Sequence, residues 1–361
     1  MQAPSWLPDL ASRVDVRIAQ LLDSELQRWT DIDASLAEPL DALRRLVLAG
    51  GKRLRPAFCY WAFVGAGGDD GSDAWVDGAA ALELQHVSAI IHDDVIDDSP
   101  KRHGAETIHH EFAGRHAARG WRGEDRRFGE GAAILTGNLA AAYADQLLAG
   151  ASGSGAAARV FADLRLEVNA GQYLDARRTA GGDIDPDGAL QICLYKSAKY
   201  TVERPLHLGA ALAGGTAGLA RLEAPLSAFG VPLGTAFQLR DDLLDAFGDP
   251  KRTGKPAGAD LREGKATYLY ALARGAATGE AASFLARRYG RADLTDGDVD
   301  RLQSIFVDTG ARAATESLID GLLAEALTAL AALAALATAP LTGPALTALA
   351  ELATYVVERD R

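Results

Sequence analysis

Two clusters of aspartate carry the clearest chemical signal in the sequence. They occupy residues 93–97 (DDVID) and 241–245 (DDLLD), and both follow the pattern DDxxD. In a helix, the first and last aspartate of each cluster lie one turn apart on one face, where like charges destabilise the helix. A hard cation such as Mg²⁺ binds carboxylate oxygens and takes phosphate oxygens as further ligands. The duplication therefore predicts two walls of one polyphosphate site.

A simpler interpretation is that these aspartates form solvated helix faces or helix N-caps, which is the usual role of a single Asp-rich run. Two clusters with identical spacing, each within an apolar stretch, argue against it. Burying carboxylates without a partner is costly, so a cation is the better explanation.

Composition narrows the class of protein. The chain has 361 residues, 48% of them hydrophobic, which is enough for one large domain or two ordinary ones. Its net charge of −12 argues against a nucleic-acid partner. Cys59 and Cys193 are isolated, so neither a zinc site nor a disulfide framework is indicated. The N-terminus has no basic stretch followed by an apolar run, and we expect a cytoplasmic location.

The longest uncharged stretch runs over residues 326–350 and is rich in alanine and leucine. A membrane span needs about 20 strongly apolar residues without a break. Pro340, Gly343 and Pro344 interrupt this stretch. We therefore expect two helices packed against their neighbours and no membrane span.

Helical periodicity prevails along the chain, and alternating strand patterns are nearly absent. Helices are expected at residues 79–96, 132–148, 156–179, 189–213, 226–246 and 265–274. Glycine-rich breaks fall at residues 65–71, 150–155, 181–188 and 214–218. The strongly charged segment 113–131 is interpreted as a mobile solvent loop. No change in composition marks a boundary, so we predict one all-α domain over residues 1–361.

Several segments could bind phosphate. Residues 50–56 read GGKRLRP, in which two glycines allow close backbone approach and three cations supply charge, although basic loops are also common as plain surface. His86 lies two helical turns before Asp93 and shares its face. Lys196 and Lys199 lie one turn apart in an apolar helix, where they could reach solvent or a ligand. Residues 254–265 are rich in glycine and charge, which suits a loop that closes over phosphate.

The order of these motifs resembles that of the trans-prenyltransferases, also called polyprenyl or isoprenyl diphosphate synthases. The motifs are GGKRLRP, ELQH before HDDVID, KSAKYT, FQLRDDLLD and GKPAGADLREGKAT, and the likeness runs from Gly50 to the C-terminus. It implies a large helical bundle around a central cavity, the isoprenoid synthase type I fold. It also implies condensation of isopentenyl diphosphate with an allylic diphosphate (dimethylallyl, geranyl or farnesyl), three Mg²⁺ ions per site with Mn²⁺ as a substitute, and a homodimer.

The resemblance assigns roles to individual residues. Direct metal ligands are implied at Asp93, Asp97 and Asp241, with indirect or water-mediated contact at Asp94, Asp242 and Asp245. Contacts to the allylic diphosphate are implied for Arg102, Lys196, Ser197, Gln238, Lys255 and Lys265. Contacts to isopentenyl diphosphate are implied for Gly51, Lys52, Arg55 and His86. Together with the metal, Lys196 and Lys255 are expected to neutralise the departing pyrophosphate, so they count with the aspartates as catalytic.

The chain departs from the family pattern at three positions. His103 stands where a second arginine is common, so a permanent cation has become a titratable one in the isopentenyl diphosphate site. Ser197 replaces the more usual threonine and keeps the hydroxyl. Asn138 replaces a frequent aspartate.

Product length is expected to depend on the turn before the first aspartate cluster. Ser88 and Ala89 would line the tunnel for the growing chain, and family members that stop at fifteen carbons often carry a bulky aromatic there. Two small residues predict an open tunnel and geranylgeranyl diphosphate, with twenty carbons, as the product. A longer product of C25–C50 and farnesyl diphosphate are the alternatives.

Two other classes of protein share parts of this pattern. A class I terpene cyclase pairs one DDxxD with a motif of the Asn/Ser/Glu type, and a non-catalytic prenyltransferase subunit usually loses one aspartate cluster. Both clusters are present here together with GGKRLRP, which favours the synthase.

Overall fold

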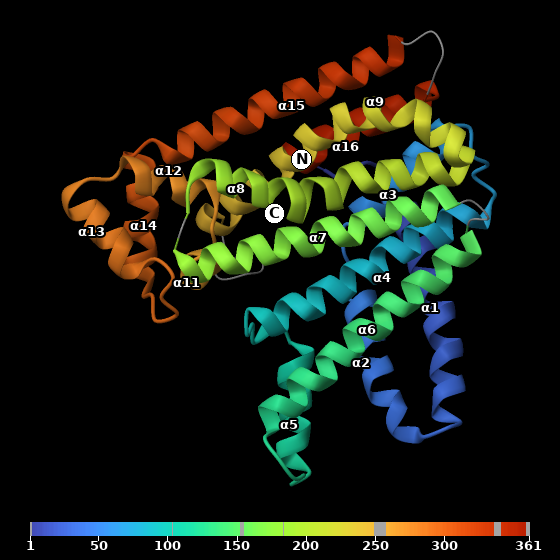
Figure 1. Cartoon of the computed structure of the whole chain (residues 1–361), viewed down its shortest axis with the longest axis horizontal. Coiled ribbons are helices and arrows are strands. Elements are labelled where there is room, and N and C mark those ends of the chain that lie inside the picture. Colours follow the sequence, from blue (N-terminus) through green and yellow to red (C-terminus); the bar gives the residue numbers. More distant parts are fainter. Residues whose placement is uncertain are drawn as a thin grey trace.

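The computed structural model describes residues 2–102, 104–151, 155–182, 184–248, 258–335 and 341–358. These residues are helical almost throughout (Figure 1), which confirms the predicted all-α class. The strands among them are β1 (Lys101–Arg102) and β2 (Ala105–Glu106), which pair antiparallel. His103 and Lys255, both predicted site residues, lie outside the described residues.

The first half of the chain forms α1 (Leu7–Thr30), the 3₁₀ helix η1 (Ala34–Leu36), α2 (Ala37–Leu48), α3 (Leu54–Gly65), α4 (Asp73–Ile96), α5 (Ile108–Ala118), α6 (Asp125–Ala151) and α7 (Gly155–Gly181). The second half forms α8 (Pro186–Ile192), the π-helix η2 (Cys193–Glu203), α9 (Arg204–Phe247), α11 (Ala259–Glu263), α12 (Tyr268–Ala276), α13 (Gly279–Arg288), α14 (Asp296–Asp308), α15 (Ala311–Ala335) and α16 (Gly343–Glu358).

Helix α4 is central to the fold. The Ser72 side chain caps its N-terminus by accepting a hydrogen bond from the Ala74 backbone N–H at 3.2 Å. Buried residues such as Trp75 and Leu84 occur on all sides of α4, which packs against α1, α3, α6 and α9. A helix that is apolar on all sides is normally enclosed by neighbouring helices. The first aspartate cluster therefore lies at the end of a helix that its neighbours enclose.

The predicted helix over residues 189–213 is divided into three parts. The chain passes from α8 into the π-helix η2 and then into α9, and α7 and α9 both pack against η2. π-Helical turns widen the backbone locally and often mark functional sites. The predicted break at residues 214–218 is a kink at Gly215 (φ 58°), so the predicted helix 226–246 is the second part of α9.

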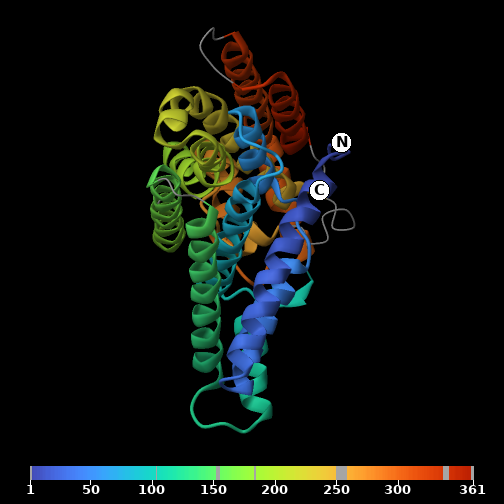
Figure 2. The ribbon, with the colours of Figure 1, turned by 90° about the vertical axis from the view of Figure 1, so that its right-hand side faces the viewer.

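The prediction of a mobile loop over residues 113–131 was wrong. Most of this segment belongs to α5 and α6, which extend with α1 into a lobe away from the C-terminal helices (Figure 2). Arg115 and Arg119 form ion pairs with Glu38 of α2 at 2.9 and 2.8 Å. The rings of Trp121 and Phe128 pack edge to face at 5.2 Å. The charges in this segment are therefore matched by an acidic partner that is distant in sequence.

The apolar stretch 326–350 spans the end of α15 and the start of α16. Helix α15 packs along α9, and α16 packs against α3, α9 and α15. Within the described ranges, α15 is the helix whose length and composition would allow it to cross a membrane, and 22% of its most apolar window is buried. Figure 1 shows it as the outermost helix along the upper edge of the molecule.

Candidate active site

Both aspartate clusters face one cavity of about 520 Å³, which we call the carboxylate chamber. Helices α4, α7, α9 and α11, the π-helix η2 and strand β1 contribute to its walls. Its charged and polar lining residues include Asp93, Asp97, Lys101, Arg102, Asp175, Lys196, Ser197, Gln238, Asp242, Asp245, Asp260, Glu263 and Lys265.

A second cavity of about 350 Å³, which we call the side chamber, lies beside the first. Asp93, Lys196 and Ser197 line both. The remaining walls of the side chamber include Arg55, Gln85, His86, Ser88, Ala89, Val168, Gln172 and Tyr200. The sequence therefore predicted residues on the walls of both cavities, and the structure brings them together at one junction.

Each aspartate cluster lies at the C-terminal end of a helix. Helix α4 ends at Ile96, with Asp97 in the C-cap position, and α9 ends at Phe247, two residues after Asp245. The helix dipole places partial negative charge at this end, which is unfavourable for carboxylates and favourable for cations. The position of both clusters is thus a second reason to expect a bound cation between them.

The first cluster is surrounded by donors. Asp93 Oδ1 accepts a hydrogen bond from Gln172 Nε2 at 2.6 Å. Asp94 Oδ1 accepts from Arg102 at 2.5 Å, and Asp97 forms an ion pair with Lys265. These contacts divide the cluster, because Asp94 holds Arg102 on β1 while Asp93 and Asp97 face the chamber.

The π-helix η2 carries Lys196 into the chamber because two glycines let it pack closely. A Cβ atom at Gly171 would lie 2.4 Å from the Lys196 backbone nitrogen, and one at Gly234 would lie 2.5 Å from the Ala198 Cα. Lys196 Nζ then lies 2.6 Å from Asp175 Oδ2 and 3.6 Å from Asp93 Oδ1.

The second lysine of this segment, Lys199, has a different environment. Its Nζ lies 3.0 Å from both Glu167 and Glu203, and it does not line either chamber. Of the two lysines that the sequence left open, Lys196 is therefore the one that a ligand in the chambers can meet.

The second cluster presents its later members to the chamber. Asp242 Oδ1 accepts a hydrogen bond from Gln238 Nε2 at 2.7 Å, and Gln238 Oε1 accepts from Ser197 Oγ at 2.5 Å. Asp245 Oδ2 accepts from the Asp260 backbone N–H at 2.8 Å. Asp241, for which direct metal ligation was predicted, is exposed at the edge of this wall and is not among the lining residues.

The charge balance of the carboxylate chamber fits a divalent cation. Its described lining contains seven carboxylates and four basic side chains. Burial raises the pKa of Asp242 to about 7, and burial also raises the pKa values of Asp260 and Glu263. Burial acts in the same direction on Asp93, but Lys196 and other cations hold the pKa of Asp93 below its usual value. Hard oxygen ligands with excess negative charge are what Mg²⁺ requires.

The GGKRLRP segment contributes one cation to the side chamber. Arg55 lies over the Tyr200 ring at 4.6 Å and donates a hydrogen bond to Thr201 Oγ1 at 2.9 Å. Arg55 Nε and the Tyr200 hydroxyl are both buried without a hydrogen-bond partner within the described ranges. Buried polar atoms are usually satisfied, so these two indicate a polar ligand. Gly51 and Lys52 precede α3 and do not line either chamber.

Arg53, counted with these cations in the sequence, has a structural role. It adopts φ 47°, and its guanidinium contacts Glu83 at 2.7 Å and Asp15 at 2.7 Å. The side chains of Arg53 and Glu83 are each 4% exposed. Arg53 is therefore held by the fold and is not available to a ligand in either chamber.

Sequence reasoning missed Gln172 and Asp175 of α7. They lie three residues apart, one helical turn, and contact Asp93 and Lys196 respectively. That spacing was the available signal, but α7 carries many other polar residues, so it did not stand out. Asp260 and Glu263 fall in the segment predicted to close over phosphate, and α11 places both on the chamber wall.

An all-helical fold with two aspartate clusters facing one cavity defines the class of isoprenyl diphosphate synthases, and comparison with known proteins agrees. The sequence profile named polyprenyl synthetase matches residues 37–306. The structure of a Corynebacterium glutamicum geranylgeranyl pyrophosphate synthase, complexed with isoprenyl diphosphate and magnesium, superimposes with a TM-score of 0.90, 35% identity and coverage of 98% of this chain and 99% of that one.

Two sequence relatives cover most of the chain. A geranylgeranyl diphosphate synthase of Mycobacterium tuberculosis is 34% identical over 78% of this chain and 75% of its own length. A geranylfarnesyl diphosphate synthase of Aeropyrum pernix is 30% identical over 75% of this chain and 80% of its own length. The chain therefore belongs to the polyprenyl synthetase family of trans-prenyl diphosphate synthases.

Proposed function

We propose that this protein condenses isopentenyl diphosphate with an allylic diphosphate and extends the chain to geranylgeranyl diphosphate, releasing pyrophosphate. The observation that carries the proposal is the junction of the two chambers at Asp93, Lys196 and Ser197. One chamber combines carboxylates with cations, as a metal-bound diphosphate requires. The other combines the half-buried Arg55 with the small side chains of Ser88 and Ala89, as a second diphosphate and a growing prenyl chain require.

The carboxylate chamber is the proposed site of the allylic diphosphate and its metal ions. The residues that would hold Mg²⁺, or Mn²⁺ in its place, are Asp93 and Asp97 on the chamber wall and, from the edge of that wall, Asp241. Asp94, Asp242 and Asp245 would contribute through water or neighbouring contacts. When bound, the proposed three ions supply positive charge that stabilises a departing pyrophosphate. Lys101 and Arg102 border the same space and would donate hydrogen bonds to the diphosphate.

Cleavage of the allylic C–O bond leaves negative charge on pyrophosphate. The side chains that would neutralise it are Arg102, Lys196 and Lys265, which line the chamber. The resemblance to the family adds Lys255, which lies outside the described residues. Ser197 and Gln238 add hydrogen-bond donors that fix its orientation. Donors that are already in place cost no reorganisation during the reaction, which makes this form of stabilisation effective.

The side chamber is the proposed site of isopentenyl diphosphate. Arg55 and His86 line it, Gly51 and Lys52 lie just before α3, and the orphaned Arg55 Nε and Tyr200 hydroxyl would gain an acceptor. The double bond of isopentenyl diphosphate attacks the allylic cation, and the proton then lost goes to the departing pyrophosphate. The product is five carbons longer than the primer. His103 would add a titratable donor beside Arg102.

We infer the product length from two small side chains, Ser88 and Ala89, in the wall of the side chamber. Ser88 is 3% exposed, and both Ser88 and Ala89 line the cavity one to two turns before Asp93. No bulky side chain closes the chamber at either position, which supports a C20 product. The named relatives make products of different length, so a C25–C50 product and a C15 product remain the competing outcomes of the assay.

The same proposal includes a homodimer formed through α6 and α7. Ile134 and Leu135 of α6 and Leu166 and Tyr173 of α7 are 45–70% exposed. Large apolar side chains exposed on neighbouring helices are typical of an interface.

We further propose one polyprenyl synthetase domain over residues 1–361 and a cytoplasmic location, without a nucleic-acid partner or a membrane span.

The test is a product assay. Purified protein is incubated with Mg²⁺, isopentenyl diphosphate and each allylic primer in turn, and the dephosphorylated products are separated by chromatography. We expect C20 alcohol from all three primers, whereas elongation with none of them would refute the proposal. A cyclic hydrocarbon made without isopentenyl diphosphate would instead indicate a terpene cyclase.

A matched pair of lysine variants connects the assay to the chambers. Lys196→Gln is expected to reduce kcat at least 100-fold, because this lysine faces the leaving group. Lys199→Gln removes the same charge one turn further along η2, outside both chambers, and is expected to retain activity in a sample that circular dichroism shows to be folded. Equal losses in the two variants would contradict the assignment of Lys196.

A further inference from the structure

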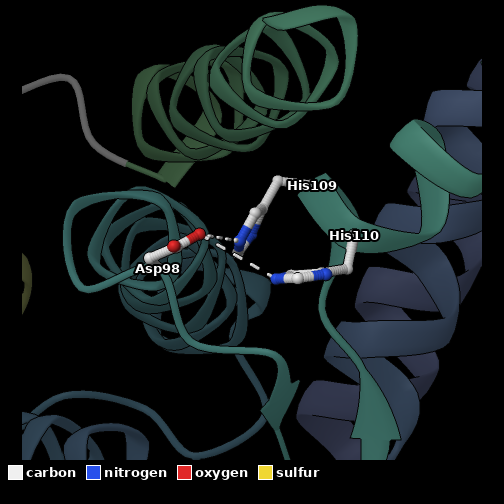
Figure 3. A group of neighbouring side chains, drawn as sticks. All are labelled: Asp98, His109 and His110. Carbon is white, nitrogen blue, oxygen red and sulfur yellow. Dashed lines mark ion pairs between the residues drawn. The ribbon is translucent and has the colours of Figure 1, made fainter. Parts of the chain in front are cut away.

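Three potential metal ligands cluster outside both chambers, where α4 ends and α5 begins. Figure 3 shows Asp98 with the imidazoles of His109 and His110 directed toward its carboxylate. Asp98 Oδ1 lies 3.7 Å from His109 Nε2 and 3.9 Å from His110 Nε2, and the candidate ligand atoms all lie within 4.8 Å of one another. None of the three lines the carboxylate chamber or the side chamber.

In the described part of the chain, the imidazole of His109 lacks a hydrogen-bond partner, which indicates that a bound group belongs between the three side chains. The residue is 4% exposed, and both of its ring nitrogens are buried without a hydrogen-bond partner among the residues that the structure describes. The contact with Asp98 is longer than a hydrogen bond. Buried imidazole nitrogens normally find a partner, so an atom placed between the three side chains would satisfy His109.

We propose that Asp98, His109 and His110 bind one transition-metal ion of the Zn²⁺ type, with water as the fourth ligand. A tetrahedral ion with ligands at about 2.0–2.1 Å places its ligand atoms roughly 3.3 Å apart. The two Nε2–Oδ1 distances exceed that by about half an ångström, which small side-chain rotations can close. Two imidazoles with a single carboxylate favour zinc over Mg²⁺, which prefers oxygen ligands.

The two carboxylate oxygens of Asp98 have different neighbours. Oδ1 faces the imidazoles, whereas Oδ2 lies 3.7 Å from Arg126 Nη2 of α6. The basic side chain lies on the Oδ2 side of the carboxylate, which leaves Oδ1 for the metal. Asp98 also adopts φ 52°, a conformation that few residues other than glycine tolerate without compensation.

The ion would act as a clip between helices. It would join the residue after Asp97 to the first turn of α5, across the β1–β2 hairpin that carries Lys101 and Arg102. Both of these cations line the carboxylate chamber. The site would thus fix the hairpin while remaining distinct from the Mg²⁺ ions proposed for the aspartate clusters.

Zinc binding is measured with saturating Mg²⁺ present, so that the aspartate clusters are occupied. A chromophoric chelator competes for Zn²⁺ in solution, and crystals grown with Zn²⁺ are measured at the zinc absorption edge. We expect one anomalous peak between Asp98, His109 and His110. A peak at the aspartate clusters alone would overturn the proposal.

Two variants test the ligands one at a time. His110→Ala removes a ligand whose side chain is 40% exposed, and Asp98→Asn removes the charge while keeping a residue type that accepts positive φ. Each is expected to weaken zinc binding at least tenfold, whereas His116→Gln, on the same helix, should change it less than about twofold. Wild-type affinity in His110→Ala, in a folded sample, would contradict the site.

Discussion

Replacing Ser88 with phenylalanine is the sharpest test of how product length is set. Ser88 lies five residues before Asp93 on α4, about 7.5 Å along the helix axis at 1.5 Å per residue. A cavity of about 150 Å³ accommodates one benzene ring, so a phenyl group would occupy roughly two fifths of the 350 Å³ side chamber. The growing chain would lose the space for about one isoprene unit.

The expected effect is large in energetic terms. Each buried methylene contributes about 0.8 kcal/mol, so excluding a five-carbon unit removes about 4 kcal/mol of favourable burial. A difference of that size changes a partition between elongation and release by roughly 1,000-fold. We therefore expect Ser88→Phe to move the main product at least one unit shorter, from C20 to C15.

Chromatography of the dephosphorylated products from geranyl and farnesyl primers measures this shift directly. Ser88→Ala serves as the control, because it removes only the hydroxyl and should leave the product profile unchanged. Activity with a short primer must persist in Ser88→Phe, which shows that the diphosphate sites are intact. An unchanged profile in an active Ser88→Phe enzyme would refute the assignment of this wall.

Three further predictions test the walls of the site. Asp93→Ala and Asp241→Ala should each abolish turnover, and substantial residual activity in either would contradict a metal site built from two facing clusters. Arg53→Gln breaks the buried pair with Glu83 and should lower the free energy of unfolding by about 3–5 kcal/mol. Lys52→Gln should raise KM for isopentenyl diphosphate with little loss of stability. The opposite pattern would show that Lys52 is the structural residue and Arg53 the one that binds substrate. The third prediction concerns pH and is tested in EDTA, without metal. Burial raises the pKa of Asp242 from 3.8 to about 7, so the stability that protonated Asp242 contributes at low pH is lost as pH rises through 7. Asp242→Asn should therefore be up to about 4 kcal/mol more stable than wild type at pH 8 and nearly equal to it at pH 4, and an equal difference at both pH values would show that Asp242 does not titrate in this way.

Much of the site could be predicted from the sequence because its parts are local. Helix periodicity fixes how residues a few positions apart lie relative to one another, so the spacing of Asp93, Asp97 and His86 was enough to place them on one helix. The resemblance to the trans-prenyltransferases predicted Ser88 and Ala89 on the tunnel wall, and both line the side chamber. The functional roles of these residues stay predictions until the assays are done.

Other features depend on contacts between distant segments. Asp175 meets Lys196 only because two glycines let η2 pack closely against α7 and α9. Arg53 leaves the phosphate-binding group because its backbone turns at φ 47° and directs the side chain to Glu83. Segment 113–131 is ordered by Glu38 of α2, which lies more than seventy residues away in sequence.

The sequence by itself therefore determined the class of chemistry, because residue types and spacings of one or two turns are preserved in any helix that forms. Tertiary structure alone decided which side chains complete the site. It brought Gln172 to the side chamber and Asp175 to the carboxylate chamber, turned Lys199 away from both, and gathered Asp98 with His109 and His110 outside them. The direction of a side chain depends on backbone dihedral angles and on the packing of distant helices, and neither can be read from spacing along the chain.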